Sequence, residues 1–164
     1  MSGITFNPLN TDTDPPADPP AGDVVMFDGW WPSINITAVR EAVRIDTTVT
    51  PDRLRDSVRH AMLDIAQDLE GWRAQQEAAG HTNLEAVPAR REIDGQSDYL
   101  MRFNRAVYSV VGGDVGERQL GSGLTSAGAD RAEQLKADVD VHARNVSAAV
   151  RAFLGLPRIR ARLC

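Results

Sequence analysis

The sequence is poor in the residues that carry most covalent and metal chemistry. Among 164 residues there is one cysteine, Cys164, which excludes an intrachain disulfide, a cysteine-based zinc site and a reaction that needs a resolving thiol. The chain has three histidines and contains neither an H-E-x-x-H nor a G-x-S-x-G motif. Such a composition suits a reducing compartment and gives little support to an enzyme.

Aromatic residues and long apolar runs are also scarce. Phe, Trp and Tyr make up 5% of the chain, and many apolar positions are Ala, Val or Leu, which favours helix-on-helix packing. No apolar run approaches the roughly 20 residues that span a bilayer, and the first residues lack the basic and apolar regions of a signal peptide. We therefore expect an all-α protein, one domain in size, that stays in the cytoplasm where it is made and does not enter a membrane.

Charge is distributed unevenly along the chain. The net charge is −5, and residues 1–39 hold five aspartates without any Lys or Arg, so the remaining 18 acids and 18 bases balance. At the other end, Arg151 and the arginines of the last seven residues face no acid after Asp140. The two termini are thus oppositely charged, a polarity that suits contacts between subunits as well as it suits DNA.

The composition divides the chain into three parts. Residues 1–23 contain five prolines among Asp, Thr and Ala, and we expect a flexible acidic arm because so little apolar surface can be buried there. Residues 24–155 are predicted to form a helical domain of about four helices, and residues 156–164 a basic C-terminal tail. We expect the tail to dock on an acidic protein surface or a subunit neighbour through Arg158, Ile159, Arg160, Arg162 and Leu163.

An aromatic segment, residues 24–34, follows the arm. It places Phe27, Trp30 and Trp31 beside an Asp-Gly turn and a proline. One interpretation is that these side chains cap the protein's own helices. The other is that Trp30 and Trp31 insert into a neighbouring subunit, since Trp is enriched at the energetic centres of interfaces.

Periodicity predicts the helices. A short helix is expected over residues 37–45, capped by Thr37, and one long helix over 51–80, with Thr50 as its cap and Gly80 as its end. A third helix is predicted over about 96–118, weakened by Gly112 and Gly113, and a last one over about 129–154. The loop after Gly80 is expected to attach to the core through Leu84 and Val87, and the glycine-rich residues 121–128 to form a linker.

Candidate chemical sites are weak. Gly123 to Gly128 match half of a phosphate-binding loop, but the lysine is missing. His142 lies on the apolar stripe of the last helix, where a hydrogen-bonded core or interface histidine is a better interpretation than a metal ligand. The carboxylates of Asp56, Asp64 and Asp68 are interspersed with arginines, which is typical of a solvated or subunit-contacting face. We predict no catalytic, cofactor or metal site.

Several segments resemble one protein family when their order and spacing are taken together. These are RIDTTVTPDRLRDSV, WRAQQEAAG, LEAVPA, IDGQS, FNRAV and LGLPR, which span about Trp31 to Arg158. In this respect the chain resembles the head completion proteins of gpL type from peduovirus-like tailed phages. The match weakens around residues 112–127, which are richer in glycine than the family pattern leads one to expect.

The resemblance implies a structural virion protein of the head-tail junction that acts after DNA packaging. It implies a connector adaptor that docks under the portal protein as a cyclic ring of about twelve copies, helps to retain DNA, and forms the attachment site for a tail-side stopper or tail completion protein. Packaged DNA would pass through the ring without sequence-specific contacts.

Two alternatives stay open at this point. One is a small DNA-binding or terminase-associated packaging protein in which the helices of residues 37–80 form a degenerate helix-turn-helix. The other is a helical hydrolase that uses Asp64, Asp68 and Asp98.

Overall fold

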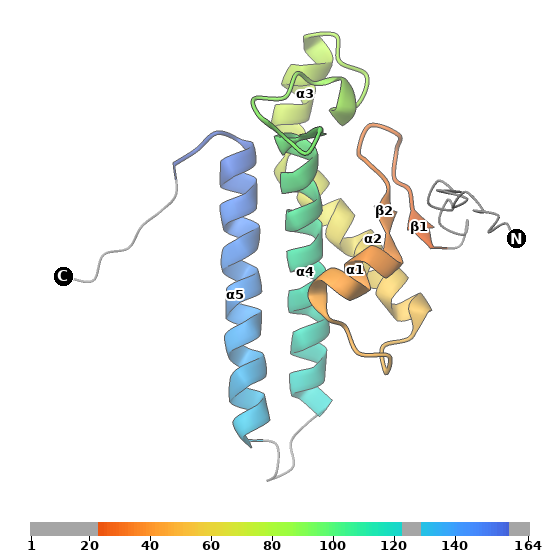
Figure 1. Cartoon of the computed structure of the whole chain (residues 1–164), viewed down its shortest axis with the longest axis vertical. Coiled ribbons are helices and arrows are strands. Elements are labelled where there is room, and N and C mark those ends of the chain that lie inside the picture. The colour runs from red at the N-terminus through yellow and green to blue at the C-terminus, as the bar shows by residue number, and fades with distance from the viewer. Residues whose placement is uncertain (1–22, 123–128, 158–164) are drawn as a thin grey trace, which may run out of the picture.

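A computed structural model of the chain describes residues 23–122 and 129–157, and within these ranges the protein is mostly helical (Figure 1). The described residues form five α-helices rather than the predicted four, together with a 3-10 turn and two antiparallel two-stranded sheets, so the all-α prediction is only roughly right. The elements are β1 (Val24–Val25), β2 (Ile34–Asn35), α1 (Ile36–Val43), α2 (Pro51–Asp68), α3 (Glu70–Ala78), η1 (Leu84–Ala86), β3 (Glu92–Ile93), β4 (Gln96–Ser97), α4 (Asp98–Ser122) and α5 (Ala129–Phe153).

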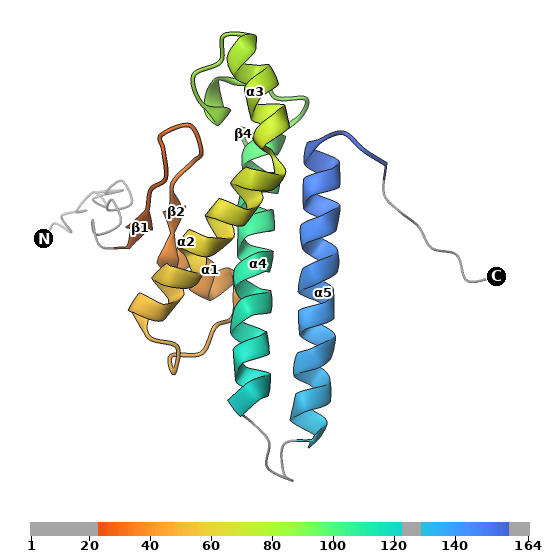
Figure 2. The same cartoon turned by 180° about the vertical axis from the view of Figure 1, so that it is seen from behind.

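Helix α4 is the centre of the structure. Helix α5 runs antiparallel along one side of it, whereas α1, α2 and the β1–β2 hairpin lie on the other side (Figures 1 and 2). The predicted apolar face of α4 is confirmed, because Phe103, Val107 and Val111 are fully buried. They belong to the same core cluster as Leu54 and Val58 of α2. Helix α5 is covered less completely, since its main neighbour is α4 alone.

The start of α1 differs from the prediction. The cap is Asn35, whose side-chain oxygen accepts a hydrogen bond from Ala38 N at 2.9 Å, and the helix ends at Val43 because Arg44 adopts a left-handed conformation with φ of 55°. Thr37, the predicted cap, instead donates its hydroxyl to Asp23 Oδ2 at 2.8 Å. Asn and Thr are both good caps, so local sequence did not distinguish them.

The long helix predicted over residues 51–80 is two helices. Its ends are as predicted: Thr50 Oγ1 accepts from Arg53 N, Pro51 occupies the first turn, and Gly80 has a φ of 93°. The break falls at the buried Leu69, whose φ and ψ of −103° and 4° are not helical. Gly71 follows in the first turn of α3, and glycine is a weak helix former. In Figure 2, α2 crosses α4 obliquely and α3 stands beyond its end.

The loop after Gly80 is attached as predicted and also contains an element that was missed. Leu84 and Val87 are buried, 0% and 5% exposed. Between Val87 and α4, β3 and β4 form a hairpin whose turn residues, Asp94 and Gly95, have φ values of 52° and 72°. Asp-Gly is the expected pair for a hairpin turn with two positive φ angles, so this signal was present in the sequence.

Two glycines of α4, Gly112 and Gly116, serve helix packing. A Cβ added to Gly112 would lie 2.5 Å from His142 Cε1 and 2.7 Å from Val43 Cγ1, and one added to Gly116 would lie 2.9 Å from Val139 Cγ2. Small residues here let α5 approach α4 closely. Helix α4 continues to Ser122, beyond its predicted end at about residue 118. The predicted linker lies outside the described residues from position 123 to 128. None of the helices in the described part of the chain is both long and apolar enough to span a membrane.

Candidate interaction surfaces

The carboxylates considered for catalysis are separated by the fold. Asp56, Asp64 and Asp68 are exposed on α2, as expected for a charged face, whereas Asp98 is buried at the start of α4. Within residues 23–122 and 129–157, no three His, Cys, Asp or Glu residues are grouped so that they could hold a metal ion.

The two tryptophans of the aromatic segment lie in the protein's own core. Trp30 and Trp31 are 4% and 3% exposed, and Trp31 stacks on Phe103 of α4 with ring centroids 4.9 Å apart. Trp30 contacts Trp72 of α3, which in turn contacts Phe153 of α5. The aromatic residues therefore join the N-terminal hairpin to three helices. In the same segment, Met26 and Phe27 are 80% and 40% exposed, so they are the apolar side chains that could contact another molecule.

An aspartate and an arginine hold the turn of this segment. The Asp28 carboxylate accepts hydrogen bonds from Trp30 N at 3.0 Å and Trp31 N at 3.4 Å, and it pairs with Arg73 of α3, which also bonds Glu77. Burial acts to raise the pKa of Asp28, but these bonds and the Arg73 charge outweigh it and hold the pKa below its ordinary 3.8. Burial likewise acts to lower the pKa of Arg73, and the bonds to Asp28 and Glu77 raise it above its usual value. The turn is thus a rigid part of the surface.

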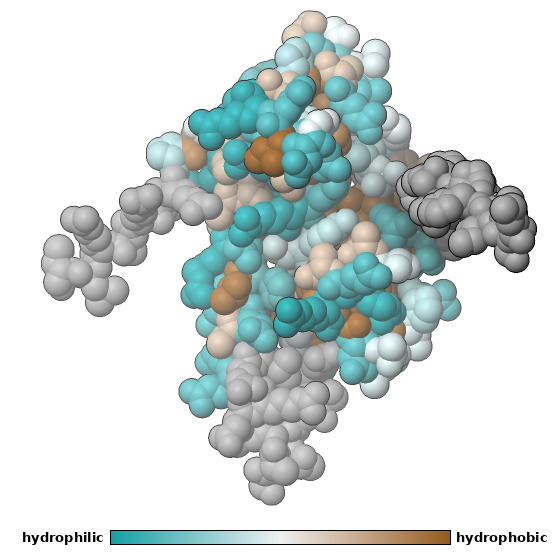
Figure 3. All heavy atoms as spheres, viewed as in Figure 1, coloured by the Kyte–Doolittle hydropathy of each residue, from teal (hydrophilic) through white to brown (hydrophobic). Residues whose placement is uncertain are grey.

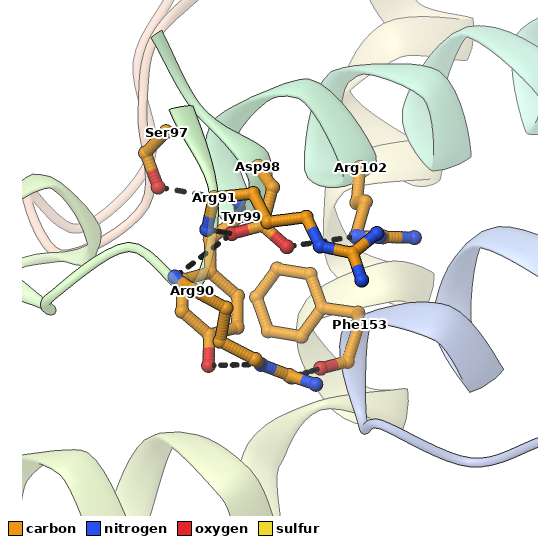
Figure 4. A network of polar contacts seen from close by, with 7 residues as sticks. All are labelled: Arg90, Arg91, Ser97, Asp98, Tyr99, Arg102 and Phe153. Atoms are coloured by element: carbon orange, nitrogen blue, oxygen red, sulfur yellow. Dashed lines mark hydrogen bonds and ion pairs between the residues drawn. The ribbon is translucent and has the colours of Figure 1, made fainter. Parts of the chain in front are cut away.

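A second polar network ties the loop before β3 to the ends of α4 and α5 (Figure 4). Asp98, 7% exposed, accepts from Arg90 N at 3.2 Å, Arg91 N at 3.4 Å and Arg102 Nε at 3.3 Å. The Arg90 guanidinium bonds the Tyr99 hydroxyl at 2.7 Å and the backbone oxygen of Phe153. Sequence reasoning missed this network, because its partners are distant in sequence or belong to a loop.

The C-terminal end of α5 is anchored where the predicted tail begins. Gly155 has a φ of 74°, Leu156 N donates to Arg151 O at 2.7 Å, and the Arg151 guanidinium donates two hydrogen bonds to Pro157 O. Leu156 is 46% exposed. The predicted tail contacts, Arg158, Ile159, Arg160, Arg162 and Leu163, lie outside the described residues.

The first described residue, Asp23, is also anchored. Its backbone oxygen accepts from Ile36 N at 2.7 Å, and Arg55 of α2 bonds the backbone oxygen of the next residue, Val24, at 3.1 Å. The β1–β2 hairpin, which follows Asp23, lies on the α2 side of α4, and α5, which ends at Phe153, lies on the other side (Figures 1 and 2). The described part of the chain therefore begins and ends on opposite sides of α4.

Many arginines that could suggest nucleic-acid binding serve the fold instead. Arg40 bonds three backbone oxygens in the loop between α1 and α2, those of residues 45, 46 and 49. Arg73, Arg102 and Arg118 pair with the carboxylates of Asp28, Asp98 and Asp114. In addition, the α1–α2 connection, residues 44–50, is longer than the three- or four-residue turn of a helix-turn-helix.

His142 is half-buried and lies against Gly112, where it lines a hollow between α1, α4 and α5. The predicted hydrogen bond is not found at its Nδ1, which is buried without a partner. Tyr108 lines the same hollow, and burial raises the pKa of its hydroxyl.

Comparisons with known proteins agree with the resemblance found in the sequence. A family model described as phage head completion protein (GPL) matches residues 25–164. The chain is also 34% identical over 141 residues to the head completion/stabilization protein of Escherichia phage P2, a match that covers 85% of this chain and 83% of that protein. No solved structure matches the chain.

Proposed function

The chain belongs to the phage head completion protein family, and from this premise we propose that it is a connector adaptor at the portal vertex. Its family assigns it a structural role in completing the head, as a component of the virion. The finer proposal is that copies dock under the portal protein after packaging, close into a ring of about twelve, help to retain the DNA, and form the site to which a tail-side stopper or tail completion protein attaches.

The observation that supports this proposal best is that the described chain begins and ends on opposite sides of α4. In the sequence, the residues before Val24 are acidic and those after Pro157 are basic. Contacts between different surfaces of identical subunits build rings when the rotation closes, and oppositely charged sides favour such contacts.

The role in assembly is tested by electron microscopy of lysates from a phage that carries an early stop codon in this gene. We expect DNA-filled heads that leak their DNA, together with separate, complete tails. Empty heads that never packaged DNA would favour the packaging alternative, and normal virions would contradict any role in assembly.

The role of the tail is tested by a truncation after Pro157, which keeps the Arg151 contacts. We expect the truncated protein to fold with an unchanged circular dichroism spectrum but to lose binding to purified DNA-filled heads. The matched control keeps the length and replaces Arg59, Arg131 and Arg144 with Gln, which removes three positive charges elsewhere, as many as the truncation removes. Binding of the truncated protein at wild-type level would refute the tail's role.

A further inference from the structure

The turn between β1 and β2 carries an apolar knob, which we define as Met26 and Phe27. Both side chains are exposed, whereas the segment around them is held by buried Trp30 and Trp31 and by the bonds to Asp28. Met26 is 80% and Phe27 40% exposed, so the fold of the isolated chain leaves much of their apolar surface uncovered. Exposed apolar groups with a polar surround are typical of contact surfaces.

A groove with matching properties lies between the first half of α4 and the last half of α5. It has a volume of about 280 Å³, and its apolar lining is formed by Ile93, Met101, Ala148, Ala149 and Ala152. Ile93 and Met101 are 54% and 39% exposed, and the alanines of α5 leave the space between the helices open. The side of the molecule seen in Figure 3 is mainly hydrophilic, with small hydrophobic patches set among polar residues.

The knob and the groove match in size. A cavity of about 150 Å³ is enough to hold a benzene molecule. The groove, at about 280 Å³, therefore has room for the phenyl ring of Phe27 and the thioether of Met26.

Their surroundings also match in charge. The knob lines a hollow together with Glu85, whereas the groove is edged by Arg102 and Arg105. Asp28 beside the knob is paired with Arg73, and Asp98 partly neutralises Arg102, so the charges left for a contact are those of Glu85 and Arg105. Arg105 bonds the neutral side chain of Asn145 at 3.1 Å, so its charge is available to an acidic partner. Glu85 beside the knob facing Arg105 at the groove edge favours this pairing over knob against knob.

Knob and groove lie on different sides of α4, because the hairpin packs on the α2 side and the groove is formed with α5. We propose that the knob of one copy occupies the α4–α5 groove of the next copy. The contact joins two different surfaces, so it can be repeated around a ring. It rests on the proposed ring assembly and names the residues that would make it.

Cysteine cross-linking tests the contact. In a Cys164→Ser background, Met26→Cys and Ala148→Cys are made in separate chains with different tags. They are mixed at high concentration, and also assembled on DNA-filled heads that lack the protein, and are treated with a short bismaleimide. We expect cross-linked dimers that contain both tags. The control is Leu63→Cys, which places a thiol at an exposed apolar position of α2, 49% exposed and outside both surfaces; its mixture with Ala148→Cys should give none.

A second measurement uses charge instead of thiols. Met26→Asp with Phe27→Asp should weaken self-association by at least about tenfold, the loss expected when one or two buried apolar side chains are removed from an interface. Leu63→Asp should leave association unchanged. Met26→Asp alone, at a position that is 80% exposed, should unfold at the wild-type temperature, whereas Phe27 is 40% exposed and partly packed, so the double variant is compared only where its circular dichroism spectrum shows it to be folded.

The outcomes separate the contact from the proposed function. Cross-links between two Met26→Cys chains, cross-links to the portal or a tail protein, or no cross-link in solution or on heads would overturn the knob-and-groove contact. Head binding and DNA retention by the wild-type protein are measured in the same experiment. The proposed function is therefore tested independently of the knob-and-groove contact.

Discussion

Replacing Gly112 with alanine should have two opposite effects on the free energy of unfolding, one through helix propensity and one through packing. Alanine is the better helix former by about 1 kcal/mol, so a sequence-based argument predicts stabilisation. The added Cβ, however, would lie 2.5 Å from His142 Cε1, 2.7 Å from His142 Nε2 and 2.7 Å from Val43 Cγ1. These atoms belong to α5 and α1, so the added methyl group would clash with side chains of two helices.

The two neighbours differ in how easily they can move. The His142 ring can rotate at little cost, because its Nδ1 has no hydrogen-bond partner to lose. Val43 is β-branched and restricted at χ1, so relief there requires a shift of α1. Overpacking of this kind costs about 1–3 kcal/mol, which leaves a net loss of up to about 2 kcal/mol after the helix gain.

The adjacent residue provides a matched control. A Cβ on Gly113 would meet only His142 Cβ, at 3.8 Å, which is an ordinary contact. Gly113→Ala should therefore show the helix gain alone and stabilise the protein by up to about 1 kcal/mol. Between the two variants we expect a difference of about 2 kcal/mol, or roughly 4–8 °C in melting temperature for a chain of this size.

The assay is urea unfolding of both variants, followed by circular dichroism, together with thermal melts. The double variant Gly112→Ala with His142→Ala should recover part of the loss, since one of the two obstacles is removed. If Gly112→Ala proves as stable as Gly113→Ala, the close approach of α4, α5 and α1 at this point is wrong.

Two further predictions concern the polar networks. Asp98→Ala should lower the free energy of unfolding by about 2–3 kcal/mol, because it leaves the backbone N–H groups of Arg90 and Arg91 and the Arg102 guanidinium without their acceptor; a loss under about 0.5 kcal/mol in urea unfolding would contradict this. Because the pKa of Asp28 is lower in the folded protein, its ionised form favours folding above about pH 4, and this contribution is lost as the pH falls through the folded pKa. The stability difference between wild type and Asp28→Asn should thus be larger at pH 7 than at pH 3, and an equal difference at both would be evidence against the Arg73 pairing.

Much of the helical framework could be predicted from local sequence. The spacing of Phe103, Val107 and Val111 identified the buried face of α4, and Thr50, Pro51 and Gly80 marked real helix boundaries. These features depend on a period of 3.6 residues and on capping chemistry that operates over a few neighbouring residues. The order of short motifs also placed the chain in its family, which periodicity alone could not do.

Tertiary contacts decided the rest. The break at Leu69, the burial of Trp30 and Trp31 and the bonds of Arg90 depend on partners that are distant in sequence. From the sequence alone, Gly112 is expected to destabilise its helix. The structure shows that a larger residue would clash with His142 and Val43 at this position. Sequence by itself determined which residues turn inward on each helix and which family the chain resembles. The structure decided which surfaces meet, because a hydrophobic stripe specifies that a helix must be covered but not by which neighbour.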